Sequence, residues 1–192
     1  MKPRILSVFS FLILFSCAGE DRTDLTPVLP AESSQEQFFS NLLSLCGETF
    51  AGESTYPEDN PDHALTGNEL RAVVKTCTSD LIEVDFLRET DTWHATWVLA
   101  KRESGLHLYH DHVGEKTPEE LGEDNLSGYG GYANDQGSAT RQFFPADKTT
   151  AEMIPEASTN VWMMEMDLEN GTFVYSLERH ATPRFRAELT LL

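Results

Sequence analysis

The dipeptide Asn170-Gly171 constrains the fold more than any other feature, because it separates two stretches of alternating apolar and polar residues. A type I′ turn needs positive φ at both central positions, and Asn-Gly adopts this conformation readily. A two-residue loop would pair Leu168 with Phe173, Met166 with Tyr175, Met164 with Leu177 and Trp162 with Arg179. The first three pairs are apolar, so the turn and the alternation together predict a β-hairpin with one buried face.

Similar alternation recurs along the chain. Residues 82–86 and 184–191 each switch between apolar and charged side chains, and a second hairpin is expected at Glu103-Ser104-Gly105, joining 93–101 to 106–113. Further strands are predicted at 48–54, 69–76 and 139–144. About eight short antiparallel strands separated by turns predict a mainly β fold, either a barrel or a strongly curved sheet. A β-sandwich is the competing architecture.

One helix is expected at the beginning of this β-rich part. Ser33 and Glu36 have the spacing of a capping box, and Gly47 is a plausible stop. The apolar residues between them recur at helical intervals: Phe38, Phe39, Leu42, Leu43 and Leu45. Such a broad apolar stripe predicts a helix buried against one end or one face of the sheet.

The first 16 residues resemble a bacterial secretion signal. A short positive stretch that contains Lys2 and Arg4 precedes the largely apolar residues 5–15, which are too few to span a bilayer permanently. Leu14-Phe15-Ser16-Cys17 resembles a lipobox, which implies acylation of Cys17 and attachment to a membrane in the periplasm or on the cell surface. Cleavage after Ala18, releasing a soluble secreted protein, and a retained signal anchor are the alternatives.

Composition divides the rest of the chain. Residues 17–33 have few large apolar side chains, which is typical of a flexible tether, and residues 34–192 suffice for a single β-rich domain with its N-terminal helix. The glycine-rich stretch 114–137 lacks the alternation of the predicted strands and is expected to be a long connection. The net charge of −18 argues against nucleic acid or anionic lipid surfaces as partners.

Two cysteines fall in the predicted domain, Cys46 and Cys77. An even pair in an oxidising compartment more often forms a disulfide than a metal site. A disulfide between them is therefore predicted, and two free buried thiols are the alternative.

The histidine-rich segment 106–112 is the most suggestive candidate for chemistry. Residues two apart share a face of a strand, so His110 and His112 should point inward with Leu106 and Leu108. Two imidazoles spaced this way could ligate zinc or another divalent metal, with His94, His63 or Glu165 as a third ligand. The alternative is a pair of hydrogen-bonded histidines at the rim of the core. No cofactor other than this metal is predicted.

Aromatic side chains supply a second candidate site. The inner faces of the predicted strands carry Trp93, Trp97, Trp162 and Tyr175, which could line a cavity for a small apolar ligand. The alternative is plain core packing, which is the more common role of aromatic residues at strand spacing. Residues 127–132 place two tyrosines in what reads as flexible backbone, without the lysine of a phosphate-binding loop.

The domain resembles an uncharacterised group of secreted bacterial proteins over residues 38–192. The similarity runs through Leu45-Cys46-Gly47, Trp97-Val98-Leu99, His110-Asp111-His112, Tyr129-Gly130-Gly131, Phe144-Pro145-Ala146-Asp147 and Asn160-Val161-Trp162. This resemblance implies no catalytic role. The expected barrel more loosely resembles the calycins, which implies carriage of a small apolar ligand, although their glycine-x-tryptophan signature is missing here.

These observations favour a binding or accessory module that acts outside the cytoplasm, with a small-molecule or protein partner left open. A metal-dependent enzyme or metal binder using His110 and His112 is one alternative, and a calycin-like carrier is the other.

Overall fold

The structure is a computed structural model that describes residues 33–56, 65–89, 91–114 and 127–192. The predicted signal peptide, Cys17, almost all of the tether and His63 lie outside these ranges. The chain divides into two units, Met1–Ala31 and Glu32–Leu192, and every described residue belongs to the second. No helix among the described residues has the length and apolarity needed to span a bilayer.

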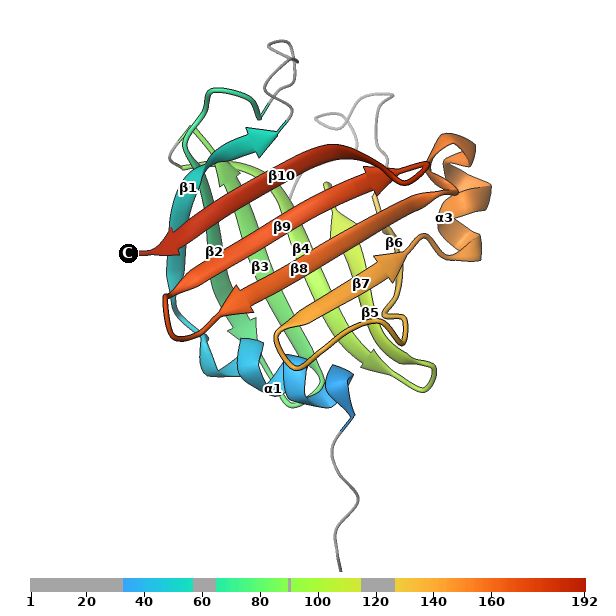
Figure 1. The fold of residues 1–192 in the computed structure, drawn as a ribbon, viewed down its shortest axis with the longest axis horizontal. Helices are drawn as coiled ribbons and strands as arrows, with labels where there is room; N and C mark the ends of the chain where they lie inside the picture. The colour runs from blue at the N-terminus through green and yellow to red at the C-terminus, as the bar shows by residue number, and fades with distance from the viewer. Residues whose placement is uncertain (1–32, 57–64, 90, 115–126) are drawn as a thin grey trace, which may run out of the picture. The chain divides into compact units, whose positions relative to one another are not determined.

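The described residues form one antiparallel sheet that is rolled into a nearly closed barrel (Figure 1). Its strands are β1 (Thr49–Tyr56), β2 (Leu70–Cys77), β3 (Leu81–Arg88), β4 (Thr92–Arg102), β5 (Gly105–Asp111), β6 (Tyr129–Tyr132), β7 (Arg141–Pro145), β8 (Asn160–Asp167), β9 (Thr172–Arg179) and β10 (Thr182–Leu191). The strand order is β6-β5-β4-β3-β2-β1-β10-β9-β8-β7. The mainly β barrel predicted from the sequence is confirmed, with ten strands in the described part rather than about eight.

The two edge strands, β6 and β7, meet at a seam that almost closes the barrel. The amide of Asn134 donates to the carbonyl of Phe143 at 2.9 Å, and the amide of Asp147 donates to that of Gly130 at 3.0 Å. The buried Thr150 hydroxyl accepts from the Gly130 amide at 2.7 Å and lies 2.8 Å from the same residue's carbonyl oxygen. Thr150 belongs to the short helix α3 (Lys148–Met153), which is followed by the 3₁₀ turn η1 (Pro155–Ala157).

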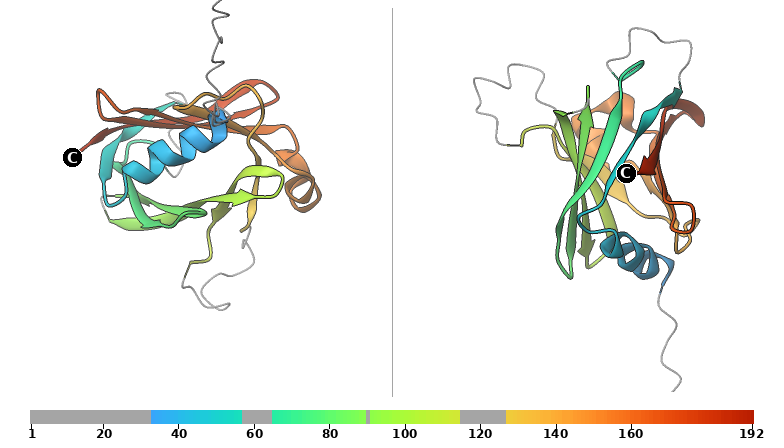
Figure 2. Two further views of the ribbon diagram at one scale, coloured as in Figure 1. Left: turned by 90° about the horizontal axis from the view of Figure 1, so that it is seen from below. Right: turned by 90° about the vertical axis from the view of Figure 1, so that its left-hand side faces the viewer.

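Helix α1 (Ser34–Ser44) lies across one end of the barrel, which we call the helix end (Figure 2). The predicted capping box between Ser33 and Glu36 is present, and the helix buries Phe38, Phe39 and Leu42. Two of its polar side chains dock on loops and strand ends. The side-chain oxygen of Gln35 accepts from the backbone amide of Leu106 at 2.9 Å. The side-chain amide of Asn41 donates to the backbone carbonyl of Ala139 at 2.8 Å.

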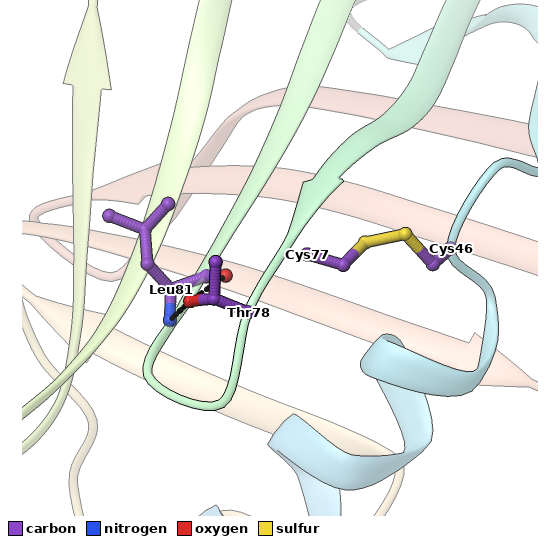
Figure 3. The surroundings of a disulfide bond; sticks show 4 residues. All are labelled: Cys46, Cys77, Thr78 and Leu81. Carbon is purple, nitrogen blue, oxygen red and sulfur yellow. Dashed lines mark hydrogen bonds between the residues drawn. A yellow bond between two sulfur atoms is a disulfide. The ribbon is translucent and has the colours of Figure 1, made fainter.

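A disulfide joins Cys46 to Cys77 at the helix end, as the sequence predicts (Figure 3). Cys46 follows α1, where Gly47 turns the chain with φ +90°, and Cys77 is the last residue of β2. The bond therefore ties the segment that follows α1 to the end of β2, in the sheet that α1 covers.

The predicted β8–β9 hairpin is present, but the predicted register is wrong by two residues. Met166 pairs with Phe173, Met164 with Tyr175 and Trp162 with Leu177, so the loop has four residues rather than two. The Asp167 carboxylate accepts from the amides of Glu169 at 3.0 Å and Asn170 at 2.9 Å, which stabilises the longer loop. A shift of two keeps every side chain on its predicted face.

The β4–β5 and β9–β10 hairpins have shorter turns. The β4–β5 hairpin lies where the sequence predicts it, with Arg102 paired to Gly105. The β9–β10 hairpin has a two-residue loop, His180-Ala181, in which both residues have φ +53°. The conformation expected of Asn170-Gly171 is therefore adopted by two residues that enter it less easily.

Candidate ligand-binding site

A cavity of about 160 Å³ lies inside the barrel at the end opposite α1, which we call the pocket end. Seven strands contribute to it, together with Leu65 and His112 from outside the strands, and most of the side chains that line it are aromatic. The lining residues are Leu65, Phe86, His94, Ala95, Trp97, His110, His112, Tyr129, Trp162, Tyr175, Leu177 and Phe185. We call this cavity the pocket.

The alternation of β5 carries the two histidines to the pocket. Leu106, Leu108 and His110 point inward and are buried, and His110 is only 2 % exposed. His112 follows the end of the strand and is half-buried at the pocket. The predicted inward face of this segment is confirmed.

Asp111, on the outer face of β5, holds the histidine segment beside β6. Its carboxylate accepts from the amide of Val113 at 2.8 Å and from the hydroxyl of Ser127 at 3.1 Å. The Ser127 hydroxyl in turn accepts from the amide of His112 at 3.2 Å. This local network brings Tyr129, at the start of β6, next to both histidines.

Each pocket histidine contacts one tyrosine hydroxyl and one backbone carbonyl. Nε2 of His110 lies 2.6 Å from the hydroxyl oxygen of Tyr175, and its Nδ1 lies 3.2 Å from the carbonyl oxygen of Tyr129. Nε2 of His112 lies 2.8 Å from the hydroxyl oxygen of Tyr129, and its Nδ1 lies 3.2 Å from the carbonyl oxygen of His94. Two histidine–tyrosine pairs therefore converge on one pocket.

Stacked rings hold these pairs in place. Trp97 stacks on both Tyr175 and Phe86, with ring centroids 4.2 Å and 4.5 Å away. The His110 ring stacks on Tyr129 at 4.8 Å and contacts Trp162 at 5.1 Å. Because each hydroxyl sits on a packed ring, neither can turn far from its histidine.

Burial keeps the central polar groups uncharged. Burial is the main reason why the pKa of His110 falls to about 3; the hydrogen bond to the Tyr129 carbonyl opposes this shift, and the nearby His112 and His94 add to it. Burial also raises the pKa of Tyr129 to about 12 and raises the pKa of Tyr175 well above its ordinary value. Groups that titrate this far from neutral pH are poorly matched to acid–base catalysis, whereas they suit a fixed binding surface.

Three of the four aromatic residues predicted to line a cavity do so: Trp97, Trp162 and Tyr175. Trp93 does not. The register between β3 and β4 shifts after Phe86, which turns Trp93 to the outer face, where its indole donates to the Thr96 hydroxyl at 3.0 Å. The same irregularity brings His94 to the pocket, and no alternation pattern could reveal that.

The prediction of a flexible loop around Tyr129 is wrong, because Tyr129–Tyr132 forms strand β6. Gly130 and Gly131 are needed at the seam: a Cβ on Gly130 would overlap the carbonyl oxygen of Leu108, and one on Gly131 would overlap that of Pro145. Glycine inside a strand marks such a close backbone approach, and this signal could have found the strand and Tyr129 with it.

Metal binding at His110 and His112 stays a prediction. Within the described ranges, no group of three or more His, Cys, Asp or Glu side chains is placed to hold a metal ion. Of the suggested third ligands, His94 lies beside His112 at a ring distance of 5.3 Å, whereas Glu165 pairs with Arg141 outside the barrel. A metal at Nε2 of either histidine would have to displace a tyrosine hydroxyl.

A larger hollow of about 250 Å³ lies beside the start of α1. Its lining includes Ser33 and Glu36, which are bonded to each other in the capping box, and the exposed side chains of Lys101 and Arg102. Its polar groups are therefore solvated or already paired, and the buried polar groups of the pocket make the smaller cavity the better candidate.

The fold and the site together define a nearly closed antiparallel barrel with a histidine–tyrosine pocket at one end. No protein family, curated protein or solved structure is found to match the chain.

Proposed function

We propose that this protein is a binding module that holds a small ligand, about the size of one aromatic ring, in the pocket. The observation that carries the proposal is the burial of two histidine–tyrosine pairs beside a cavity. Buried polar groups generally destabilise a core relative to apolar side chains unless each is paired, and here each buried imidazole is paired with a phenol and a backbone carbonyl.

The size of the pocket limits its ligand. A cavity of about 160 Å³ is smaller than the roughly 300–1,000 Å³ of sites for drug-sized molecules. It is close to the roughly 150 Å³ of an engineered apolar cavity, in another protein, that binds benzene. A single ring fits this volume, and a long-chain lipid of the kind that a calycin-like carrier would hold does not.

The electrostatics favour binding over turnover. With His110, Tyr129 and Tyr175 uncharged at neutral pH, a bound molecule meets aromatic rings and fixed hydrogen-bonding groups. The lining contains no Lys, Arg, Asp or Glu among the described residues. We therefore place a neutral ligand in the pocket.

The proposed place of action is outside the cytoplasm, with the protein tethered to a membrane by lipid on Cys17. The disulfide Cys46–Cys77 supports this location, because such bonds persist in oxidising compartments. Replacing Cys17→Ser should move the protein from the membrane fraction to the soluble fraction. Unchanged fractionation would contradict the anchor without affecting the pocket.

Calorimetric titration of the protein with phenol, a neutral one-ring probe, tests the binding function. We expect saturable binding that Leu177→Phe weakens, because Leu177 lines the pocket and a larger ring would fill it. Leu168→Phe is the matched control, since Leu168 is 45 % exposed on the β8–β9 loop. Binding that does not saturate, or that both variants weaken equally, would overturn the proposal.

A further inference from the structure

The two backbone carbonyls at the pocket fix the protonation of both imidazoles. A carbonyl oxygen only accepts, so Nδ1 of His110 must carry the hydrogen that it donates to Tyr129 O at 3.2 Å. The same reasoning puts a hydrogen on Nδ1 of His112, which lies 3.2 Å from His94 O. In a neutral imidazole the other nitrogen, Nε2, then has only a lone pair.

This assignment orients both tyrosine hydroxyls. Nε2 of His110 can only accept from Tyr175 at 2.6 Å, and Nε2 of neutral His112 can only accept from Tyr129 at 2.8 Å. Each hydroxyl has a single hydrogen, and that hydrogen is used in the bond to histidine. Two lone pairs remain on each phenolic oxygen.

We infer that the pocket presents hydrogen-bond acceptors to its occupant and so selects small rings that carry an N–H or O–H donor. Two chains of hydrogen bonds produce this selectivity. In each chain an imidazole donates to a backbone carbonyl and accepts from a phenol, which leaves the phenolic oxygen as the acceptor. A ring of the same size that can only accept would face the phenolic lone pairs without a hydrogen between them. This inference rests on the proposed binding function and adds the chemical class of the ligand.

Burial maintains the arrangement around neutral pH. His110 is 2 % exposed and Tyr175 is 6 % exposed, so neither exchanges its partner for bulk water. The low pKa of His110 keeps Nε2 as an acceptor, and the high pKa of both phenols keeps their hydrogens on oxygen. Around neutral pH the Tyr175 hydroxyl therefore keeps donating to His110, and its oxygen stays available as an acceptor.

Three one-ring probes at pH 8 test this inference on the full domain: phenol, toluene and pyridine. Phenol can donate, toluene has neither donor nor acceptor, and pyridine can only accept. We expect phenol to bind roughly fivefold more tightly than toluene, which is the range of one net hydrogen bond. Pyridine should bind more weakly than toluene. Equal affinity for all three would overturn the inference and leave the binding function standing, whereas failure of every probe to bind would overturn the binding function itself.

Two variants assign the selectivity to the tyrosine. Tyr129→Phe removes one phenolic oxygen and keeps the ring, so the preference for phenol over toluene should fall. Tyr132→Phe is the matched control, because Tyr132 lies on the same strand, is 37 % exposed and packs against His107 at a ring distance of 4.5 Å. Circular dichroism verifies that both variants fold. A preference for phenol that survives Tyr129→Phe and is lost in Tyr132→Phe would contradict the assignment.

Discussion

The helix end and the pocket end of the barrel are filled by different kinds of side chain. At the helix end, α1 inserts Phe38, Phe39 and Leu42 into the sheet, and a disulfide fixes the helix exit. At the pocket end, His110 and Tyr175 occupy positions that the same strand alternation would give to apolar residues, and a cavity remains beside them.

The two ends also differ in the backbone conformation of their turns. In the described part of the chain, the non-glycine residues with positive φ are Glu89, His180 and Ala181. All three lie in turns next to strand ends that border the pocket. Backbone strain at non-glycine residues therefore lies where binding is proposed, while the helix end contributes stability. The predictions below test this division, beginning with the largest effect.

Removal of the disulfide should weaken the helix end alone. Closing a loop of 31 residues restricts the unfolded chain, so Cys46→Ala with Cys77→Ala should lower the free energy of unfolding by about 3.5 kcal/mol. Urea denaturation measures the loss. Affinity for phenol, measured in the same protein, should stay unchanged because neither cysteine borders the pocket. A variant that loses phenol binding while keeping its stability would break the division.

One substitution made at both ends gives a direct comparison. Leu42→Ala removes a fully buried side chain from α1 and should cost about 3 kcal/mol of unfolding free energy. Leu177→Ala removes a half-buried side chain beside an existing cavity and should cost about 1 kcal/mol. Equal costs in denaturant titrations would show that the two ends are packed alike.

The buried His110 should make stability depend on pH. Its pKa is about 3 in the folded protein, against the ordinary value of 6.5 for histidine in the unfolded chain. The unfolded state therefore binds one more proton between these values, so the contribution is fully present above pH 6.5. As the pH falls from 6.5 toward 3, the free energy of unfolding should drop by up to about 1.4 kcal/mol per pH unit.

The variant His110→Gln lacks this titration and supplies the reference. The difference in unfolding free energy between the native protein and His110→Gln should shrink steadily from pH 6.5 to pH 4.5 in urea titrations. Parallel pH profiles for the two proteins would mean that His110 binds protons equally in the folded and unfolded states.

Relief of backbone strain at the pocket end should give the smallest effect. Ala181 has φ +53° in the two-residue β9–β10 turn. Glycine adopts this conformation without the steric penalty of a Cβ, so Ala181→Gly should raise the unfolding free energy by about 1 kcal/mol. Thermal unfolding measures the gain. A loss of stability would indicate that the turn is not strained.

Local patterns predicted the helix end well. The Ser33–Glu36 capping box and the apolar stripe behind it depend on residues within a few positions of one another, and α1 forms as expected. The pairing of Cys46 with Cys77 follows from their being the only two cysteines of the predicted domain. Strand alternation also placed His110 inside the barrel.

The pocket end depends on irregularities that alternation cannot encode. The bulge that turns Trp93 outward and brings in His94 is set by pairing between β3 and β4. Strand β6, which supplies Tyr129, was hidden by glycines that a distant strand requires. Hydrogen bonds to the Asp167 carboxylate stabilise a four-residue loop, where Asn170-Gly171 alone favours a two-residue loop. The first two deviations come from contacts between strands, whereas the third comes from a local turn formed by Asp167.

Nuclear magnetic resonance of the three tryptophan indole N–H groups during a phenol titration tests the central claim most directly. Trp97 and Trp162 line the pocket, whereas Trp93 donates its indole hydrogen to Thr96 on the outer face. We predict saturable shifts of the Trp97 and Trp162 signals with Trp93 unmoved. Shifts of Trp93 alone, or no saturable shift of any tryptophan, would contradict a ligand site at the pocket end.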